Sequence, residues 1–475
     1  MSKSRRTVLI AVIGFGVLLA GFAIALIVLV DADAYKDRLE TVASDALEMD
    51  VRFEGRVGVR FSPGLHLRFE VVSISNDGEP VASAGEATLG VEIWPLFRRD
   101  VRIRTLALKG SVLTVERRRD GTLNVENLEQ LDEILSALGL ARISVLDGTL
   151  AYKDRRTGAE IQATDCSLDL RHLQLPGGEG PDLMRTFSLT AEIACGEVRR
   201  GDFVASGLKA EALGTNGVLV FDPVVMTAFG AQGMGTIRVD FTGESPAYHV
   251  RYALPQIPLQ ELFAHLATDR SLEGTLDFSA DLSTRGATVG EMKRNAGGEF
   301  SMRGENLVLT GIDLDRSLRE FESSQTFSLL DAGAVFLAGP FGLVATQGYK
   351  FATLALNPGG RSEIRILVSD WHVEGGVARA HDVAMATAQN RIAAQGRLDL
   401  VNERFDGLTV ALLDAEGCVR VKQELRGSFA DAEATTPAVL ELITGPALSL
   451  IEKGVELFTG RDCEVFYSGS VAPPR

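Results

Sequence analysis

The chain has 475 residues, of which 45% are hydrophobic and 24% charged, and its net charge is −16 at pH 7. That apolar content is enough for a sizeable buried core, which excludes wholesale disorder. A surface this acidic repels phosphate backbones, so nucleic acid is not an expected partner. The 49 glycines against only 15 prolines indicate many turns, which favours β structure.

Residues 8–30 form an uncharged, apolar stretch near the N-terminus. As a helix it would be about 35 Å long, enough to cross a hydrocarbon core of ~30 Å. Lys3, Arg5 and Arg6 precede it, so the positive-inside rule predicts a cytoplasmic N-terminus at 1–7 and export of everything after residue 30. A cleaved signal peptide is the alternative, but its apolar core would be only about 7–15 residues long. We expect a retained single-pass anchor whose ends are Val8 and Val30.

Four cysteines lie in the part expected to be exported: Cys166, Cys195, Cys418 and Cys463. Disulfides persist in an oxidising compartment, which makes all four candidates for disulfide bonds. Four cysteines allow three pairings, and the sequence does not choose among them. Free thiols buried as small apolar groups are the alternative. The chain has no CxxC motif, so neither a zinc site nor a redox motif is predicted.

Apolar and polar residues alternate along much of the exported part, which predicts strands with one wet and one dry face. The alternation is clearest at 65–71, 237–241 and 276–282. Asn-Gly and Asp-Gly pairs between such runs supply the positive φ angles of tight turns; they include Asn76-Asp77-Gly78, Asp147-Gly148 and Asn216-Gly217. The pattern predicts roughly twenty or more strands in an antiparallel meander. A few helices interrupt it, at 127–138, 259–266, 313–330 and 437–458.

We expect the exported part to divide near residue 256. The N-terminal β-groove region would then cover 31–256, and a C-terminal region ending in helices would cover 257–475.

No catalytic motif is visible in the sequence. The phosphate-binding G-x-x-x-x-G-K-[ST] loop and the G-x-S-x-G nucleophile elbow are both missing. The six histidines form no H-E-x-x-H or other short pair. Carboxylate pairs for glycoside hydrolysis assemble in space and stay open at this level, although no pair stands out. We therefore expect no enzymatic activity, no metal and no cofactor.

A sheet of so many strands cannot stay flat, because strand twist makes it curl or split. Apolar faces that close on each other would form an ordinary core. A sheet that curls without closing would instead line a long apolar trough. Beside a bilayer such a trough suits acyl chains, because each buried methylene contributes about 0.8 kcal/mol. The residues expected in its wall are Leu168, Leu170, Ile237, Val239, Phe241, Leu276, Phe278 and Leu282.

Several blocks of the chain carry a family resemblance. In the first 125 residues these are Ala34-Tyr35-Lys36 after the membrane helix, Phe61-Ser62-Pro63-Gly64-Leu65, Trp94-Pro95-Leu96-Phe97 and the Asp120-Gly121-Thr122-Leu123-Asn124 hairpin. Later blocks include Leu309-Thr310-Gly311-Ile312-Asp313-Leu314 and Ala394-Gln395-Gly396-Arg397-Leu398. Together they resemble the AsmA family of inner-membrane-anchored proteins of Gram-negative envelopes.

The resemblance implies an elongated, taco-shaped β-groove related to bridge-like lipid transfer proteins, with most of the chain in the periplasm. It implies a phospholipid or other acyl-chain lipid as cargo, and roles in phospholipid transport and outer-membrane biogenesis. The chain is short for the family, so oligomers or an outer-membrane partner protein would be required to span the periplasm. The rival hypothesis is a non-transporting scaffold or assembly factor for outer-membrane proteins, with a filled core.

Overall fold

The computed structural model describes most residues from 49 to 474 and a few between 36 and 44; its longer gaps are 93–102, 125–139, 175–184, 265–270, 319–359 and 440–464. The described part is mainly β, with 21 strands and the short helices α6 (Leu259–Ala264) and α7 (Val289–Arg294). The prediction of a mainly β protein with roughly twenty strands is therefore confirmed. The chain forms two compact units, unit 1 with residues 1–201 and 212–217, and unit 2 with residues 202–211 and 218–475.

The predicted membrane anchor at 8–30 lies outside the described residues. Within the residues that are described, no helix has the length and apolar character needed to cross a bilayer. The predicted helices at 127–138 and 437–458 also lie almost entirely outside the described part.

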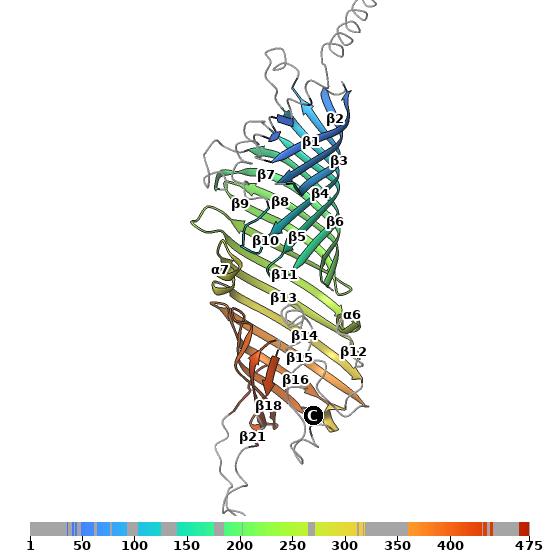
Figure 1. Ribbon diagram of the computed structural model, residues 1–475. Helices are drawn as coiled ribbons and strands as arrows, with labels where there is room; N and C mark the ends of the chain where they lie inside the picture. The colour runs from blue at the N-terminus through green and yellow to red at the C-terminus, as the bar shows by residue number, and fades with distance from the viewer. Residues whose placement is uncertain are drawn as a thin grey trace, which may run out of the picture. The chain divides into compact units, whose positions relative to one another are not determined.

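Unit 1 contains a curled sheet in which seven complete strands follow one another in chain order (Figure 1). The strands are β1 (Asp50–Arg60), β2 (Leu65–Asn76), β3 (Glu79–Val91), β4 (Ile103–Arg117), β5 (Arg142–Asp154), β6 (Glu160–Gln174) and β7 (Ser188–Arg200). Five of the six neighbouring pairs are antiparallel. In the described part β1 and β7 form no pairing with each other, so the sheet of unit 1 is unclosed.

The antiparallel prediction is wrong at one pair, because β4 and β5 run parallel. Their connection, residues 118–141, is much longer than a hairpin turn. A parallel pair requires a crossover of about a dozen residues or more, which this connection supplies. The length of the connection therefore allows β5 to return to the same end of the sheet before it begins.

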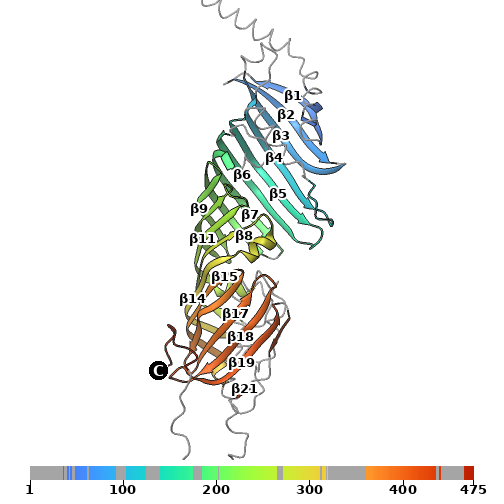
Figure 2. The same cartoon turned by 90° about the vertical axis from the view of Figure 1, so that its left-hand side faces the viewer.

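Unit 2 is built on a second run of antiparallel strands, mostly in chain order (Figure 2). The exceptions are β12, which pairs with β14 while β11 pairs with β13, and β20 and β21, which both pair with β19. Strand β8 (Phe203–Thr215) belongs to unit 2 up to Glu211 and to unit 1 from Ala212. The others are β9 (Val218–Ala228), β10 (Ala231–Asp240), β11 (Ala247–Pro258), β12 (Ser271–Glu273), β13 (Thr275–Arg285), β14 (Gly297–Thr310), β15 (Arg361–Glu374), β16 (Val377–Thr387), β17 (Arg391–Asp399), β18 (Arg404–Leu413), β19 (Val419–Ser428), β20 (Asp431–Ala434) and β21 (Ala438–Val439). The expected division at residue 256 falls inside β11 and does not coincide with the boundary between the compact units, which runs through β8.

The Asn-Gly and Asp-Gly pairs have two different outcomes. Asn216 and Gly217 join β8 to β9 with φ angles of 48° and 76°, the positive values that a tight hairpin turn requires. Asp147, by contrast, has a φ of 53° in the middle of β5. The register between β5 and β6 shifts at this point, so the pair expected to form a turn makes a β-bulge instead.

The free edge of β1 is covered by residues that precede it. The backbone N–H of Val51 donates to Oγ of Ser44 at 3.0 Å, and that of Phe53 donates to Oε1 of Glu40 at 2.7 Å. Edge N–H groups left open invite pairing with another chain. Two side chains of the segment before the sheet therefore protect this edge from such pairing.

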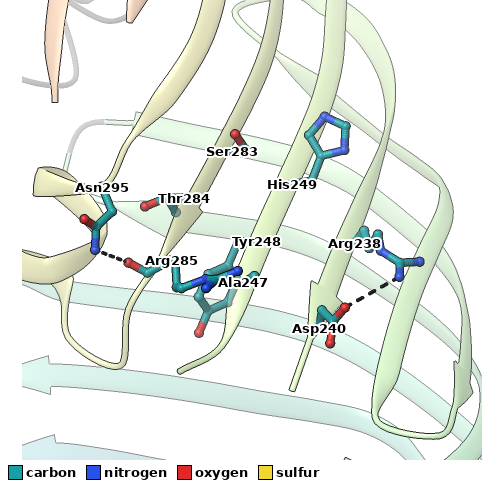
Figure 3. A pocket seen from close by; sticks show the side chains of 9 residues that line it. All are labelled: Arg238, Asp240, Ala247, Tyr248, His249, Ser283, Thr284, Arg285 and Asn295. Carbon is teal, nitrogen blue, oxygen red and sulfur yellow. Dashed lines mark hydrogen bonds and ion pairs between the residues drawn. The ribbon is translucent and has the colours of Figure 1, made fainter. Parts of the chain in front are cut away.

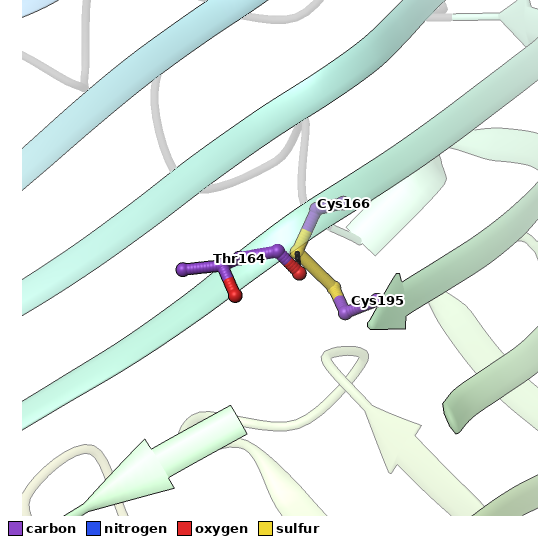
Figure 4. The surroundings of a disulfide bond; sticks show 3 residues. All are labelled: Thr164, Cys166 and Cys195. Atoms are coloured by element: carbon purple, nitrogen blue, oxygen red, sulfur yellow. Dashed lines mark hydrogen bonds between the residues drawn. A yellow bond between two sulfur atoms is a disulfide. The ribbon is translucent and has the colours of Figure 1, made fainter. Parts of the chain in front are cut away.

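A disulfide joins the neighbouring strands β6 and β7 in unit 1 (Figure 4). It links Cys166 and Cys195, whose Cα atoms are 4.0 Å apart. Cys418 is also disulfide-bonded, and Cys463 lies outside the described residues. The alternative of free buried thiols is therefore wrong for the three described cysteines.

Residues 465–474, which we call the C-terminal strap, pack on one face of unit 2. Tyr467 is 7% exposed and Val471 is fully buried against small and apolar side chains of β15 to β18. The guanidinium of Arg391 donates to the carbonyl oxygen of Val471 at 3.2 Å and lies 5.8 Å from the centre of the Tyr467 ring. Asp382 accepts hydrogen bonds from the Tyr467 hydroxyl at 2.5 Å and from the Ser470 N–H at 3.0 Å.

We expect replacement of Cys166 and Cys195 by serine to destabilise unit 1 by roughly 2–4 kcal/mol, because the bridge closes a loop of about 30 residues in the unfolded chain. Non-reducing digestion followed by mass spectrometry should recover the peptides of Cys166 and Cys195 linked to each other. Recovery of either cysteine linked to another partner, or an unchanged melting temperature of the double variant, would contradict the pairing.

We expect the strap to loosen in acid. Partial burial by itself would raise the pKa of Asp382, but its hydrogen bonds from Ser470 and Tyr467 outweigh burial and hold the pKa below 3.8. A lowered pKa in the folded state stabilises the protein above the unfolded pKa, and that stabilisation is lost as the pH falls through the folded value. Hydrogen exchange of the Val471 amide should therefore be protected at pH 7 and lose protection below about pH 4. Asp382→Asn should reduce the protection at pH 7 and remove its dependence on pH; if it does neither, the carboxylate does not hold the strap.

Candidate functional site

The register of unit 1 places apolar side chains in unbroken rows across all seven strands. Residues that face each other in paired strands project from the same side of a sheet. Two such rows contain predicted wall residues, Leu168 in the first row and Leu170 in the second. The rows are Val57, Phe69, Ala87, Leu108, Val145, Leu168 and Ile193, and Val59, Leu67, Leu89, Leu106, Ile143, Leu170 and Ala191.

A third apolar row crosses the same seven strands. In β5 it lies on the other side of the bulge at Asp147 from the first two rows. Its members are Val51, Ile74, Ala82, Leu113, Leu150, Ala163 and Val198. The rings of Phe53 and Phe69 lie 4.5 Å apart between their centroids. Phe53 lies two residues after Val51, a member of the third row, and so projects from the same face as Val51. Phe69 is a member of the first row. Because the two rings are in contact, the third row lies on the same face of the sheet as the first row. We call the three rows together the apolar face of unit 1.

The apolar face of unit 1 is only half covered. Phe69 and Ala87 are buried, but Leu108, Val145, Leu168 and Leu170 are half-buried. Leu113 is 40% exposed and Leu150 is 46% exposed. Exposed apolar side chains that are contiguous, as they are here, mark a binding surface more often than isolated ones do.

The opposite face of unit 1 is mainly polar and charged, with Val112 and Leu146, 42% and 56% exposed, as its apolar exceptions. The row Gly58, Arg68, Thr88, Ala107, Ser144, Asp169 and Glu192 lies there, one residue out of phase with the apolar rows. Hydrogen bonds from Arg171 and Arg142 lower the pKa of Asp169; the Nε of Arg142 lies 2.9 Å from its Oδ1. The sheet therefore has one apolar and one solvated face, as the alternation predicts.

In unit 2 the predicted wall residues that lie within β10 and β13 share a face, but not one row. Ile237 and Leu282 stand in the same row, which runs Phe221, Ile237, Val250, Leu282, Gly298, Val373, Ala378, Leu398 and Phe405. Leu276 stands in another, with Ile257, Gly304, Leu367, Met385, Ile392, Leu412 and Val421. Phe278 packs against the same core, Val239 is buried opposite Leu219, and Phe241 lies one residue past the end of β10.

Burial increases along these rows toward the C-terminal strands. Ile237, Val250 and Leu282 are half-buried, whereas Val373, Ala378 and Phe405 in the same row are at most 3% exposed. The row of Leu276 is buried throughout, with Met385, Ile392 and Leu412 at 0% exposure. Leu314 and Leu318, from the segment after β14, are also fully buried in this core. The Oδ1 atom of Asp315 accepts hydrogen bonds from Thr387 and Asn390 and so fixes this segment. The C-terminal strands therefore enclose a filled core.

A small polar cavity of about 350 Å³ lies where β10, β11 and β13 meet α7 (Figure 3). Its charged groups partly neutralise each other, since Arg238 pairs with Asp240 at 3.7 Å. The Asn295 side chain donates to the carbonyl oxygen of Arg285 at 2.8 Å and fixes the end of α7 there. The cavity is lined by Arg238, Asp240, Ala247, Tyr248, His249, Ser283, Thr284, Arg285 and Asn295. None of these residues is a predicted wall residue, so the cavity is separate from the apolar rows.

Most members of the apolar face of unit 1 are not among the predicted wall residues, including Leu106, Leu108, Ile143 and Val145. The signal was present, because these residues alternate with Ala107 and Ser144. The other members are harder to find, because Leu113 and Leu150 lie on the opposite phase of alternation from Leu108 and Val145. A residue with positive φ stands between the two phases in each strand, Gly110 in β4 and Asp147 in β5. No group of three or more His, Cys, Asp or Glu side chains in the described part could hold a metal ion.

We expect a charge on the half-buried part of the apolar face to be tolerated and a charge in the filled core to prevent folding. Leu168→Glu should lower the melting temperature by only a few degrees, since its carboxylate stays hydrated. Met385→Glu should fail to fold, because an unpaired buried charge costs several kcal/mol. Thermal unfolding followed by circular dichroism gives the melting temperatures of the two purified variants. An equal loss of stability in both would mean that Leu168 is as fully enclosed as Met385.

The comparison with protein families agrees with the resemblance drawn from the sequence. Residues 1–179 and 205–347 match the model of the AsmA family. No curated protein matches the chain at the level required for a relative. Because the family match covers well over half of the residues, this chain belongs to the AsmA family.

Proposed function

We propose that this protein is a lipid-binding and lipid-transfer protein of the bacterial envelope, anchored in the inner membrane by residues 8–30, with its N-terminus cytoplasmic and its two β units in the periplasm. Its cargo would be a phospholipid or another acyl-chain lipid. Its role would be in phospholipid transport and outer-membrane biogenesis. The protein would act by binding alone, without enzymatic activity and without a cofactor.

The observation that carries this proposal is the continuous, half-exposed apolar face of unit 1. Three rows of apolar side chains cross seven strands without a charged residue, and several of their members are exposed or half-buried. Strands lie about 4.8 Å apart, so seven of them present roughly 30 Å of apolar surface across the sheet. That length matches a whole bilayer hydrocarbon core of ~30 Å, and so exceeds one acyl chain, which spans about half of such a core. Covering such a surface with acyl chains is favourable by about 25 cal/mol per Å² removed from water.

The filled core of unit 2 supports a more specific version of the proposal. Its buried rows have no exposed large side chains from β14 to β19 among the described residues, so an acyl chain would find no apolar surface there. We place the lipid on unit 1 and on the half-buried rows of β9 to β13. The same filled core favours, as a second candidate, a scaffold or assembly factor for outer-membrane proteins in which unit 2 is a rigid docking element.

A pair of double variants tests the lipid proposal. Leu168→Glu with Leu170→Glu places two carboxylates side by side on the apolar face, where they oppose acyl chains. Native mass spectrometry of the full chain, extracted in a mild detergent, should show bound phospholipid in the wild type and at least a roughly tenfold lower occupancy in this variant, because each charge costs a few kcal/mol in an apolar site.

Thr88→Glu with Ser144→Glu is the matched control, since it adds the same two charges to the polar face of the same sheet. We expect it to retain wild-type lipid occupancy. Absence of phospholipid from the wild type, or equal occupancy in both variants, would overturn the lipid proposal and leave the scaffold.

A further inference from the structure

A larger cavity lies on the polar side of unit 2, beneath the C-terminal strap. Its volume is about 760 Å³, and strands β16, β17 and β18 form its floor. Strap residues 465–469 form one wall, and there the side chain of Val465 is 53% exposed. The ionisable and amide side chains that line it are Arg379, His381, Asp382, Gln395, Arg397, Asp406 and Tyr467.

Two arginines face each other directly in this cavity. Arg379 of β16 is paired in register with Arg397 of β17. Side chains in directly opposed positions have their Cβ atoms about 5 Å apart, and like charges there are destabilising. An anion placed between the two guanidinium groups would remove that repulsion.

Unit 1 contains the same arrangement with the anion supplied by the chain itself. Arg142 of β5 is opposed to Arg171 of β6. Asp169 lies between them and accepts from both, at 2.8 Å from Nη2 of Arg142 and 2.5 Å from Nη2 of Arg171. The chain therefore neutralises one opposed arginine pair with a carboxylate shared by both members.

At the pair in unit 2, no carboxylate in the described part of the chain is shared in this way. Asp406 binds Arg397 alone, at 2.8 Å. Asp382 is occupied by the Tyr467 hydroxyl and the Ser470 N–H. Among the described residues Arg379 forms no ion pair or side-chain hydrogen bond, so its guanidinium is left unneutralised in the cavity.

We propose that the cavity beneath the strap binds a phosphate-bearing anion between Arg379 and Arg397. A guanidinium offers a planar fork of donors that matches the oxygens of phosphate, and two of them provide the geometry of a clamp. The ring of His381 lines the same cavity and supplies a further donor. The side-chain amide of Gln395 also lines it; one of its two N–H groups is donated to the carbonyl oxygen of Phe466, which leaves the other for the anion. The anion is either free phosphate or the headgroup of a phospholipid, and the two share this chemistry.

The proposed anion site is independent of the lipid-binding face. Arg379 and Arg397 project from the side of the sheet opposite the filled core, since their neighbours Ala378 and Leu398 belong to that core. All residues of the site also follow residue 347, where the match to the AsmA family ends. Loss of lipid binding on unit 1 would therefore leave anion binding intact. Loss of anion binding would likewise leave lipid binding on unit 1 intact.

Broadening of the ³¹P resonance of inorganic phosphate by the full chain, at constant ionic strength, tests the site. We expect saturable broadening with the wild type. Arg379→Gln should raise the dissociation constant at least about tenfold, because it removes one of the two guanidinium groups that would clamp the anion. Arg361→Gln is the matched control, an exposed arginine of β15 outside the cavity, and should bind as the wild type does.

A second titration, with dihexanoyl phosphatidylglycerol below its micelle concentration, identifies the source of the anion. Binding tighter than that of inorganic phosphate and weakened by Arg379→Gln assigns the site to a headgroup. Equal or weaker binding assigns it to free phosphate. Hydrogen exchange of the strap confirms that Arg379→Gln is folded. No saturable broadening with the wild type, or the same dissociation constant for Arg379→Gln, would overturn the proposal.

Discussion

Backbone pairing between neighbouring strands is the constraint on which the rest of this molecule depends. Side chains alternate between the two faces of a strand, so a slip of one residue in any ladder would exchange an apolar face for a polar one. In unit 1 six successive ladders align the apolar rows across seven strands, with local shifts of register at bulges and irregularities. Leu168 and Leu170 belong to a surface only because this register is maintained. The apolar face is thus a product of hydrogen bonding between backbones as much as of side-chain composition.

The same alternating pattern gives a half-exposed apolar face in unit 1 and a filled core in unit 2. In unit 1 the apolar rows stay half-buried, with Leu150 at 46% exposure. In unit 2 the equivalent rows are covered by Leu314 and Leu318 and by the curl of the C-terminal strands, and Met385 and Ile392 are fully buried. A closed core of this kind supplies the stability that a half-open face lacks, because only fully desolvated side chains contribute their whole transfer free energy. The trough and the ordinary core, which are alternatives at the level of sequence, are both present in one chain.

On the polar faces of the sheets, several charged side chains are neutralised by neighbouring groups of the same chain. Asp169 joins Arg142 and Arg171, and Asp382 holds the strap through Tyr467 and Ser470. Against this background Arg379 is an exception, since its opposed partner Arg397 is bound to Asp406 alone. The strap itself is held by Arg391, which is 6% exposed and donates to the carbonyl oxygens of Val471, Asp414 and Ala415. Buried hydrogen bonds to a charged group are among the stronger ones, which explains why so short a segment stays in place.

The sequence by itself determined the mainly β class, the two-faced strands, the Asn216-Gly217 turn and the membership of the AsmA family, because period-two alternation, turn chemistry and family motifs are local properties of the chain. Tertiary structure alone decided four things: the parallel pairing of β4 with β5, the bulge at Asp147, the choice of Cys166 with Cys195 among three pairings, and the line between exposed and buried apolar residues. Leu168 and Met385 look alike in the sequence, since each is an apolar residue in an alternating run. They differ in burial, since Leu168 is half-buried and Met385 is fully buried. Burial depends on packing against segments that are distant in the chain, and local sequence does not show that packing.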